Sequence, residues 1–423
     1  MNSFTEKISL VFKDLNLRKR IFFVLGALLV FRFLSNIPIP GINASRLAEV
    51  LEGNQLLGLF NVFSGGGLSN LSIVMLGVGP YITASIIMQL LTVMSPRLKA
   101  MYQEEGELGR KKFSQYSRFL SIPLAAIQAI AFIVLLTRQG VMENLGLFGF
   151  VTNIIIVTAG SLLLMWIGEL MTEFGIGNGT SLIIFSGIVA GLPASLARLR
   201  ASFDPSQIPL FVGFIILAAI IIYAVVVITE AERPIPITYA KRVRGMKVYG
   251  GVSTYLPLRL NQSGVMPIIF ALSILLFPQM IFSFLAGVDN TVIKTIATFI
   301  NSALANQVVY AGFYFILVFL FTYFYTAVTF DPNMIASNLQ KSGAFIPGVR
   351  PGESTSQHIL KILTRITMVG ALFLGIIAVL PLAVQSLTNI SYLTIGGTAL
   401  LIAVSVVLDL VKKIDAQLSM REY

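Results

Sequence analysis

Ten apolar runs of membrane-spanning length constrain this chain more than any other feature of its sequence. A helix needs about 20 predominantly apolar residues to cross the ~30 Å hydrocarbon core of a bilayer. The charged content is only 12%, whereas soluble domains carry about 25%, so an ordinary soluble fold is excluded. The sequence predicts an all-α membrane protein with ten transmembrane helices. The runs lie near residues 19–37, 71–94, 118–137, 150–171, 180–198, 208–229, 264–286, 305–328, 362–383 and 391–411.

The residues before the first run are amphipathic. Within 1–17, apolar side chains recur at helical spacing opposite charged ones, which is typical of an interfacial helix. The basic residues 18–20 and the run that follows them resemble a signal peptide, but no small-residue cleavage site follows at 35–40. We therefore expect a retained first span.

The basic residues predict the orientation of the spans. Of the 30 Lys and Arg residues, 24 lie at the two ends and in alternate connections, whereas five lie in the other connections. Arg32 lies within the first span, near its outer end, where its side chain can snorkel. Basic residues accumulate on the cytoplasmic side of membranes. Both termini are therefore predicted to be cytoplasmic, with 412–423 as a cytoplasmic tail.

Two spans carry a Gly-x-x-Pro pattern at matching places in the two halves of the chain. The first half, 18–205, has it at 77–80, and the second half, 206–411, has it at 264–267. Five spans per half give the two halves opposite orientations. Pro removes a backbone donor that hydrocarbon cannot replace, so matching breaks point to a transport site where the halves meet. The same pattern arises by chance in Gly-rich membrane helices, and its occurrence in both halves favours the site.

A short apolar stretch with three glycines, 60–70, precedes the second span. It is too short to cross the membrane, and it can fold back into a cavity as a plug with a glycine hinge. A plain extracellular loop has the same composition, so composition alone leaves both interpretations open. The plug residues would be Phe60, Asn61, Val62, Phe63, Ser64, Gly65, Gly66, Gly67 and Leu68.

The residue types that carry enzymatic and ion-coupling chemistry are scarce. The chain has no Cys and one His, so thiol nucleophiles and Cys or His metal clusters are excluded. Phosphate-loop, zinc-protease and serine-hydrolase motifs are missing, and Glu169 and the other acids in the spans lie near cytoplasmic ends, where solvation explains them. We expect no enzyme, no metal and no cofactor, with energy supplied by a partner. A secondary transporter and an intramembrane protease remain the alternative classes, although both should show ionisable groups in mid-membrane.

Two long cytoplasmic loops, 231–262 and 329–361, combine basic with aromatic, Gly or Pro residues. Such loops suit RNA phosphates, acidic protein surfaces or anionic lipid, although the bias of basic residues to the cytoplasm explains much of the charge. Arg350 lies between two Pro-Gly pairs, which can present its guanidinium on a stiff tip; pairing with Glu353 is the other interpretation. The candidate docking residues are Arg350, Lys241, Arg242, Arg244 and Lys247.

Seven stretches, in the same order as in the family, resemble the SecY family, the channel subunits of bacterial protein translocases. The resemblance implies two inverted five-helix halves in a clam shell, with a plug, a constriction and a lateral gate into lipid. It implies a protein-conducting channel that translocates unfolded secretory polypeptides and releases transmembrane segments laterally. The stretches are 38–41, 60–69, 77–92, 175–193, 239–257, 341–353 and 396–398.

The resemblance also assigns residues to the constriction and the gate. An aliphatic ring can dewet and block ions while conforming around a passing chain. The family usually has an aliphatic residue where this chain has Thr180, which puts the seal on that side in question. The ring implied by the resemblance comprises Val78, Ile82, Thr180, Ile184, Ile269 and Ile402, and the gate residues are Thr83, Gln89, Gln128 and Ser273.

The resemblance implies partners and a location as well. The family acts in the cell inner (plasma) membrane with SecE-like and SecG-like small subunits, the SecA motor ATPase, the ribosome, unfolded substrates and anionic lipid. The loops 231–262 and 329–361 would dock the motor or the ribosome, with Arg350 as a key contact. Met246 and Asn333 replace basic residues that are common in relatives, which puts the match of the docking surface in question.

Overall fold

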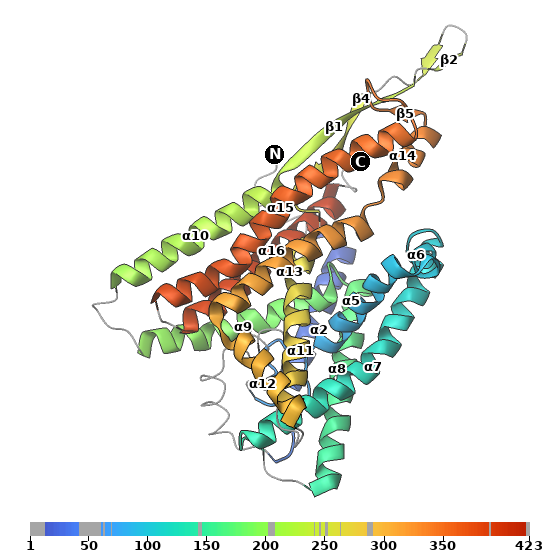
Figure 1. Ribbon diagram of the computed structural model, residues 1–423. Coiled ribbons are helices and arrows are strands. Elements are labelled where there is room, and N and C mark those ends of the chain that lie inside the picture. Colours follow the sequence, from blue (N-terminus) through green and yellow to red (C-terminus); the bar gives the residue numbers. More distant parts are fainter. Residues whose placement is uncertain are drawn as a thin grey trace. The chain divides into compact units, whose positions relative to one another are not determined.

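The computed structural model divides the chain into two compact units (Figure 1). Unit 1 comprises residues 1–213, 272–310 and 381–423, and unit 2 comprises residues 214–271 and 311–380. The predicted interfacial helix lies outside the described residues as far as residue 12. The structure describes residues 13–41, 61, 64–68, 70–142, 146–201, 208–240, 242–244, 247–249, 253–262, 264–285, 291–388 and 391–419.

A helix coincides with each of the ten predicted spans. Four stretches of the described chain are long and apolar enough to cross a membrane, namely Gly106–Arg138, Gly146–Phe174, Gln307–Lys341 and Glu353–Val384. The predicted tail, 412–423, continues the last helix as far as Ser419. The ten helices are α2 (Leu15–Leu34), α5 (Gly79–Met94), α7 (Gly106–Arg138), α8 (Gly146–Phe174), α9 (Gly179–Ala201), α10 (Ile208–Glu230), α11 (Met266–Leu285), α13 (Gln307–Thr329), α15 (Glu353–Thr388) and α16 (Ser391–Ser419).

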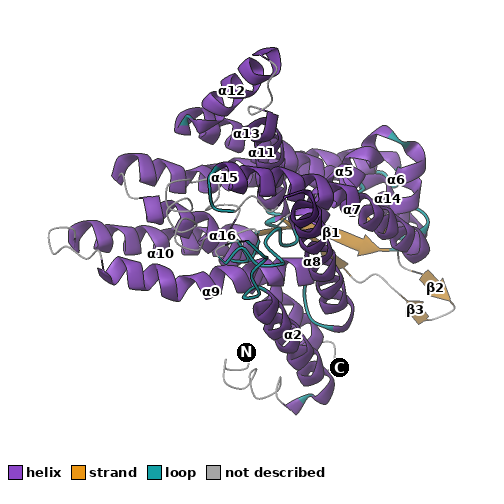
Figure 2. Cartoon of the chain, turned by 90° about the horizontal axis from the view of Figure 1, so that it is seen from below, coloured by secondary structure: helices purple, strands orange, loops and turns teal. Residues whose placement is uncertain are grey.

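Three further helices lie in the connections. They are α6 (Pro96–Gln103), α12 (Thr291–Ala305) and α14 (Pro332–Lys341). In unit 1, α5, α6 and α7 lie side by side (Figure 2), and they bury Met88, Met101 and Phe113 among themselves. The connection between the second and third spans is therefore a packed helical corner.

The two Gly-x-x-Pro patterns start helices instead of breaking them in the middle. Gly77 and Gly264 adopt left-handed φ angles of 59° and 60°, and the helices begin two residues later, with Pro in the first turn. Pro is tolerated in a first helical turn, where its missing N–H has no intrahelical partner to lose. The predicted span 71–94 is consequently helical only from Gly79, and residues 70–78 form consecutive turns.

The segment 231–262 of unit 2, which was expected to be a long loop of an all-α protein, contains strands. Strand β1 (Glu232–Tyr239) pairs antiparallel with β4 (Ser253–Arg259) along one edge and with β5 (Ala344–Phe345) along the other. Beyond them, β2 (Arg242–Arg244) and β3 (Lys247–Tyr249) form a second hairpin. Figure 1 shows β1 and β4 running along α15.

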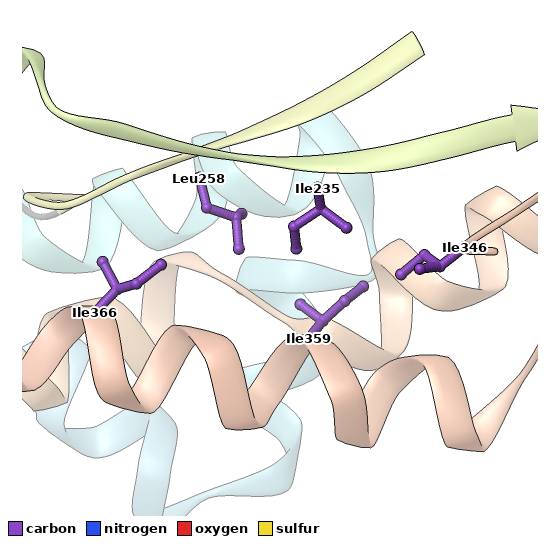
Figure 3. Packing of buried hydrophobic residues seen from close by; sticks show 5 residues of the cluster. All are labelled: Ile235, Leu258, Ile346, Ile359 and Ile366. Atoms are coloured by element: carbon purple, nitrogen blue, oxygen red, sulfur yellow. The ribbon is translucent and has the colours of Figure 1, made fainter. Parts of the chain in front are cut away.

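One face of this hairpin is buried against α15 and the segment before it. Ile235 and Leu258 point from the strands toward Ile359 and Ile366 of α15, and Ile346 completes the cluster (Figure 3). Burying an aliphatic side chain of this size stabilises a fold by roughly 1.5–3 kcal/mol. The two long loops, 231–262 and 329–361, therefore form one packed structure with the start of α15.

Candidate functional site

The predicted ring residues on α5 and α11 occupy equivalent positions. Ile82 and Ile269 are each the fourth residue of their helix, five residues after the left-handed glycine. Val78 immediately precedes α5. All five aliphatic members of the predicted ring are buried, namely Val78, Ile82, Ile184, Ile269 and Ile402.

The remaining two helices of the ring pack together within unit 1. Helix α9, which carries Thr180 and Ile184, contacts α16, which carries Ile402, and also α8. The structure thus brings Ile184 and Ile402 onto neighbouring helices. Ile269 belongs to unit 2.

Thr180, the polar member of the predicted ring, contacts Asn178 through its hydroxyl and α8 through its methyl group. Its hydroxyl donates to Asn178 Oδ1 over 2.6 Å, and its backbone N–H donates to the same oxygen over 3.1 Å. Its methyl group faces Gly168 of α8, where an added Cβ would lie 3.2 Å away. Asn178 therefore caps α9 and keeps the Thr180 hydroxyl hydrogen-bonded. Sequence reasoning missed this cap, although Asn before a helix start is its usual signal.

The described part of the predicted plug is a tight, buried series of turns. Ser64 Oγ donates to the Asn61 carbonyl over 3.0 Å and accepts from the Leu68 N–H over 3.2 Å. The N–H of Gly66 donates to the Asn61 carbonyl over 2.8 Å. Ser64 and Leu68 are fully buried. Three predicted plug residues lie outside the described residues: Phe60, Val62 and Phe63.

The described part of the predicted plug contacts both α2 and α9 at Gly65. A Cβ on Gly65 would come within 2.6 Å of the Phe31 ring, and a Cβ on Gly187 of α9 would overlap the Gly65 backbone. Arg32 Nη1 of α2 donates to the Gly65 carbonyl over 3.3 Å. Snorkelling was expected for Arg32, but the structure joins it to the plug. The signal for this role was a charged residue inside an apolar span.

The predicted gate residues are largely shielded from solvent. Thr83 Oγ1 donates to the Gly79 carbonyl one turn earlier, over 3.0 Å. Gln128 and Ser273 are buried. Among the described residues, Gln89 Oε1 and Ser273 Oγ are buried without a hydrogen-bond partner. Unsatisfied polar atoms of this kind are costly, which suits positions that exchange partners when a structure changes.

Glu169 was expected to be solvated, but the structure shows its carboxylate in an ion pair and two hydrogen bonds. Its Oε1 accepts from Arg118 Nε over 2.7 Å, from the Tyr81 hydroxyl over 3.3 Å and from Ser114 Oγ over 3.4 Å. The side chain is only 17% exposed. The carboxylate therefore joins α5, α7 and α8 at one point.

Arg350 lies at an exposed tip whose backbone is held in place. Its carbonyl accepts from Thr355 Oγ1 over 2.9 Å, and Gly348 and Gly352 on either side adopt left-handed φ angles. Its guanidinium makes no hydrogen bond or ion pair with any described residue. Glu353 accepts from Gln357 instead, so the expected alternative of an Arg350–Glu353 pair is not formed.

The other docking candidates are less fully described. Arg242, Arg244 and Lys247 lie on the β2–β3 hairpin, whereas Lys241 and Met246 lie outside the described residues. Asn333 has a structural contact, because its Oδ1 accepts from Ser356 Oγ over 2.6 Å and so links α14 to α15. Within the described part of the chain, no group of three or more His, Asp and Glu side chains could hold a metal ion.

Comparisons with known proteins agree with this arrangement. The SecY family model matches residues 72–411. The protein translocase subunit SecY of Escherichia coli strain K12 is 42% identical over 418 residues, covering 96% of this chain and 93% of that protein.

Two solved structures have the same fold at 18–19% sequence identity. One is a SecY protein whose plug domain is described as stabilising the closed state of the translocation channel and maintaining a membrane seal; its TM-score is 0.64, covering 95% of this chain and 92% of that one. The other is Sec61 in the canine ribosome-channel complex from the endoplasmic reticulum, with a TM-score of 0.62 and the same coverage.

Proposed function

The chain belongs to the SecY family and is a protein-translocation channel rather than an enzyme, and we propose that it passes unfolded secretory polypeptides across the cell inner membrane. In the same proposal, it releases apolar segments sideways into lipid. The observation that carries this is the 42% identity to a translocase SecY subunit over 96% of the chain. The distribution of basic residues supports cytoplasmic termini, because 24 of 30 lie at the ends and in alternate connections.

Co-purification separates this function from solute transport. The full chain, extracted from its native membrane in mild detergent, should retain SecE-like and SecG-like small membrane subunits and should bind the SecA motor or ribosomes. A secondary transporter has no need of these partners. Recovery of a folded chain that binds neither small subunits, motor nor ribosomes would count against the proposal.

We propose that Val78, Ile82, Thr180, Ile184, Ile269 and Ile402 form the constriction. Support comes from the burial of the five aliphatic side chains and from the equivalent positions of Ile82 and Ile269 at helix starts. Apolar constrictions exclude ions by dewetting, and aliphatic side chains can yield to a passing chain. Replacing Ile82 and Ile269 by Asn should therefore raise ion leak through vesicles that contain the folded variant. Unchanged conductance would contradict the assignment.

The plug proposal is supported by how residues 64–68 are held. The segment has its own turn hydrogen bonds, is buried, and is joined to α2 by the Arg32 contact with Gly65. The Gly67 carbonyl also accepts from the N–H and the hydroxyl of Ser72, over 3.0 and 2.9 Å, so these bonds and the Arg32 contact must break when the plug leaves. This chain has no Cys, so Leu68→Cys can be labelled without background; its labelling should be slow at rest and fast during translocation.

We propose that Thr83, Gln89, Gln128 and Ser273 line the lateral gate. The buried, unsatisfied oxygens of Gln89 and Ser273 support this, because they would gain partners when helices part and substrate or water enters. A disulfide between Thr83→Cys and a facing Cys on α11 should block both secretion and membrane insertion. Normal export with the bond fully formed would remove the gate proposal.

Arg350 is proposed as the contact of the docking loops with the motor or the ribosome. The support is its exposed guanidinium, which pairs with no described residue, on a tip whose backbone is held by the Thr355 hydrogen bond. The tip lies close in sequence to Ile346 and Ile359 of the packed core. A planar guanidinium recognises carboxylate or phosphate through two parallel hydrogen bonds, which suits an acidic protein surface or RNA. Arg242, Arg244 and Lys247, on the second hairpin, and Lys241 beside it are proposed to add to the same surface. Anionic lipid at the basic loops belongs to the same proposal.

A further inference from the structure

Helix α12 has three distinct faces around its axis. Successive helical residues are 100° apart, so residues spaced by three or four share a face. The described side chains divide into a buried or half-buried face, a polar face and an exposed apolar face. These are, respectively, Ala297, Ile300 and Leu304; Lys294, Thr298 and Ser302; and Val292, Ile296 and Phe299.

The apolar face is large and open. Val292 is 67% exposed, Ile296 is 53% exposed and Phe299 is 73% exposed. Three large apolar side chains on one stripe are unusual for a water-exposed helix with a polar face available beside them. Something apolar therefore covers this stripe in the native setting.

The connection to the next span places α12 at the membrane surface. Only Asn306 separates the end of α12 from the start of α13, and its Oδ1 caps α13 by accepting from the Val308 N–H over 3.0 Å. Val308, already 80% exposed, begins the apolar surface of that span. The apolar stripe of α12 is thus continuous along the chain with a surface that faces hydrocarbon.

The polar face of α12 also suits a position at the membrane surface. The hydroxyls of Thr298 and Ser302 donate to backbone carbonyls of their own helix, over 2.8 Å each to Lys294 and Phe299. These groups therefore need few bonds to water, and Lys294 can reach the headgroup layer.

We propose that α12 is an interfacial helix that inserts Val292, Ile296 and Phe299 into the acyl-chain boundary of the outer leaflet. The partner is the lipid itself rather than another protein. The inference requires that the chain spans a membrane with the predicted orientation, but not that it conducts polypeptides.

Site-directed spin labelling tests the proposal directly, because the chain has no Cys. Single-cysteine variants of the full chain are placed in vesicles of phosphatidylethanolamine and phosphatidylglycerol. The collision rates of each spin label with oxygen, which partitions into lipid, and with a water-soluble nickel complex are then compared. Test positions are Ile296→Cys and Phe299→Cys, matched controls are Lys294→Cys and Ser302→Cys, and Ala297→Cys reports the buried face.

At Ile296 and Phe299, we expect the spin label to collide more often with oxygen than with the nickel complex. At Lys294 and Ser302, we expect more collisions with the nickel complex. At Ala297, both collision rates should be low. If nickel exceeds oxygen at all exposed positions, then α12 lies in water and the proposal is wrong. If Ile296 and Phe299 are shielded from both reagents, then a protein covers the stripe and lipid is not the partner. A non-conducting chain with the expected pattern would leave this inference intact while overturning the proposed function.

Discussion

At the scale of single residues, close backbone packing positions residues 64–68 of the proposed plug. Gly187 lacks the Cβ that would collide with Gly65, and Gly65 in turn makes room for the ring of Phe31. Arg32 adds one hydrogen bond, from its Nη1 to the Gly65 carbonyl. The position of residues 64–68 thus depends on the missing Cβ atoms of Gly65 and Gly187 as much as on hydrogen bonds.

Gly187→Ala should displace the plug. Overpacking of this kind costs about 1–3 kcal/mol, which corresponds to a roughly 5- to 150-fold rise in the displaced population. The measurement is the labelling rate of Leu68→Cys together with resting ion leak. Gly191→Ala, on the same helix with open space around it, is the matched control and should change neither. If the two variants had the same labelling rate and the same ion leak, then the position of Gly65 would not depend on its contact with Gly187.

Arg350→Glu should reduce motor-driven export about tenfold or more, because charge-assisted hydrogen bonds contribute about 1.5–3 kcal/mol each. Its guanidinium makes no hydrogen bond or ion pair with any described residue, so expression and membrane insertion should be unchanged. Arg365→Glu, an exposed charge reversal on α15 outside the loop 329–361, controls for net charge. A variant that is degraded, or that exports normally, would mean that Arg350 is not the docking contact.

At the scale of elements, hydropathy predicts helices well and connections poorly. Each of the ten predicted spans coincides with a helix, because a run of about 20 apolar residues has few other stable states in lipid. The start of α5 was misplaced, because residues 71–78 are as apolar as a span but are covered by protein. Hydropathy measures apolarity and does not distinguish lipid from a protein interior.

The hairpin of unit 2 was also missed, although its signal is visible in retrospect. Ile235 and Ile237 alternate with less buried residues along β1, and alternation with a period of two is typical of a half-buried strand. Pro234 and Pro236 concealed it, since Pro usually argues against a strand interior. The contacts of Arg32 and Glu169 could not be predicted, because their partners come from other elements.

Ile359→Ala tests the packed core of that element. The side chain is fully buried beneath β1 and β4, and deleting it should destabilise unit 2 by about 2–5 kcal/mol. The measurement is the midpoint of thermal unfolding in detergent, or protease sensitivity of the loop 231–262. The neighbouring Leu360→Ala removes a side chain that is 51% exposed and should have a much smaller effect. If the two variants were equally stable, then the cluster would not hold the loops together.

At the scale of the whole molecule, the chain is a protein-translocation channel of the SecY family, and the proposed constriction, plug and docking loops would divide its tasks. In this proposal the constriction and the plug keep the channel closed at rest. A partner bound at the docking loops supplies the energy for movement.

The most direct test of this account is export of a polypeptide by the purified chain. The chain, reconstituted in vesicles with its small membrane subunits, is given the motor ATPase, ATP and a labelled, unfolded secretory precursor, and external protease is then added. The account predicts a protease-protected fraction that requires both ATP and this chain. A disulfide between Thr83→Cys and a facing Cys on α11 should abolish this fraction. If no precursor became protected while the folded chain still bound the motor, then the chain would not be a protein-conducting channel.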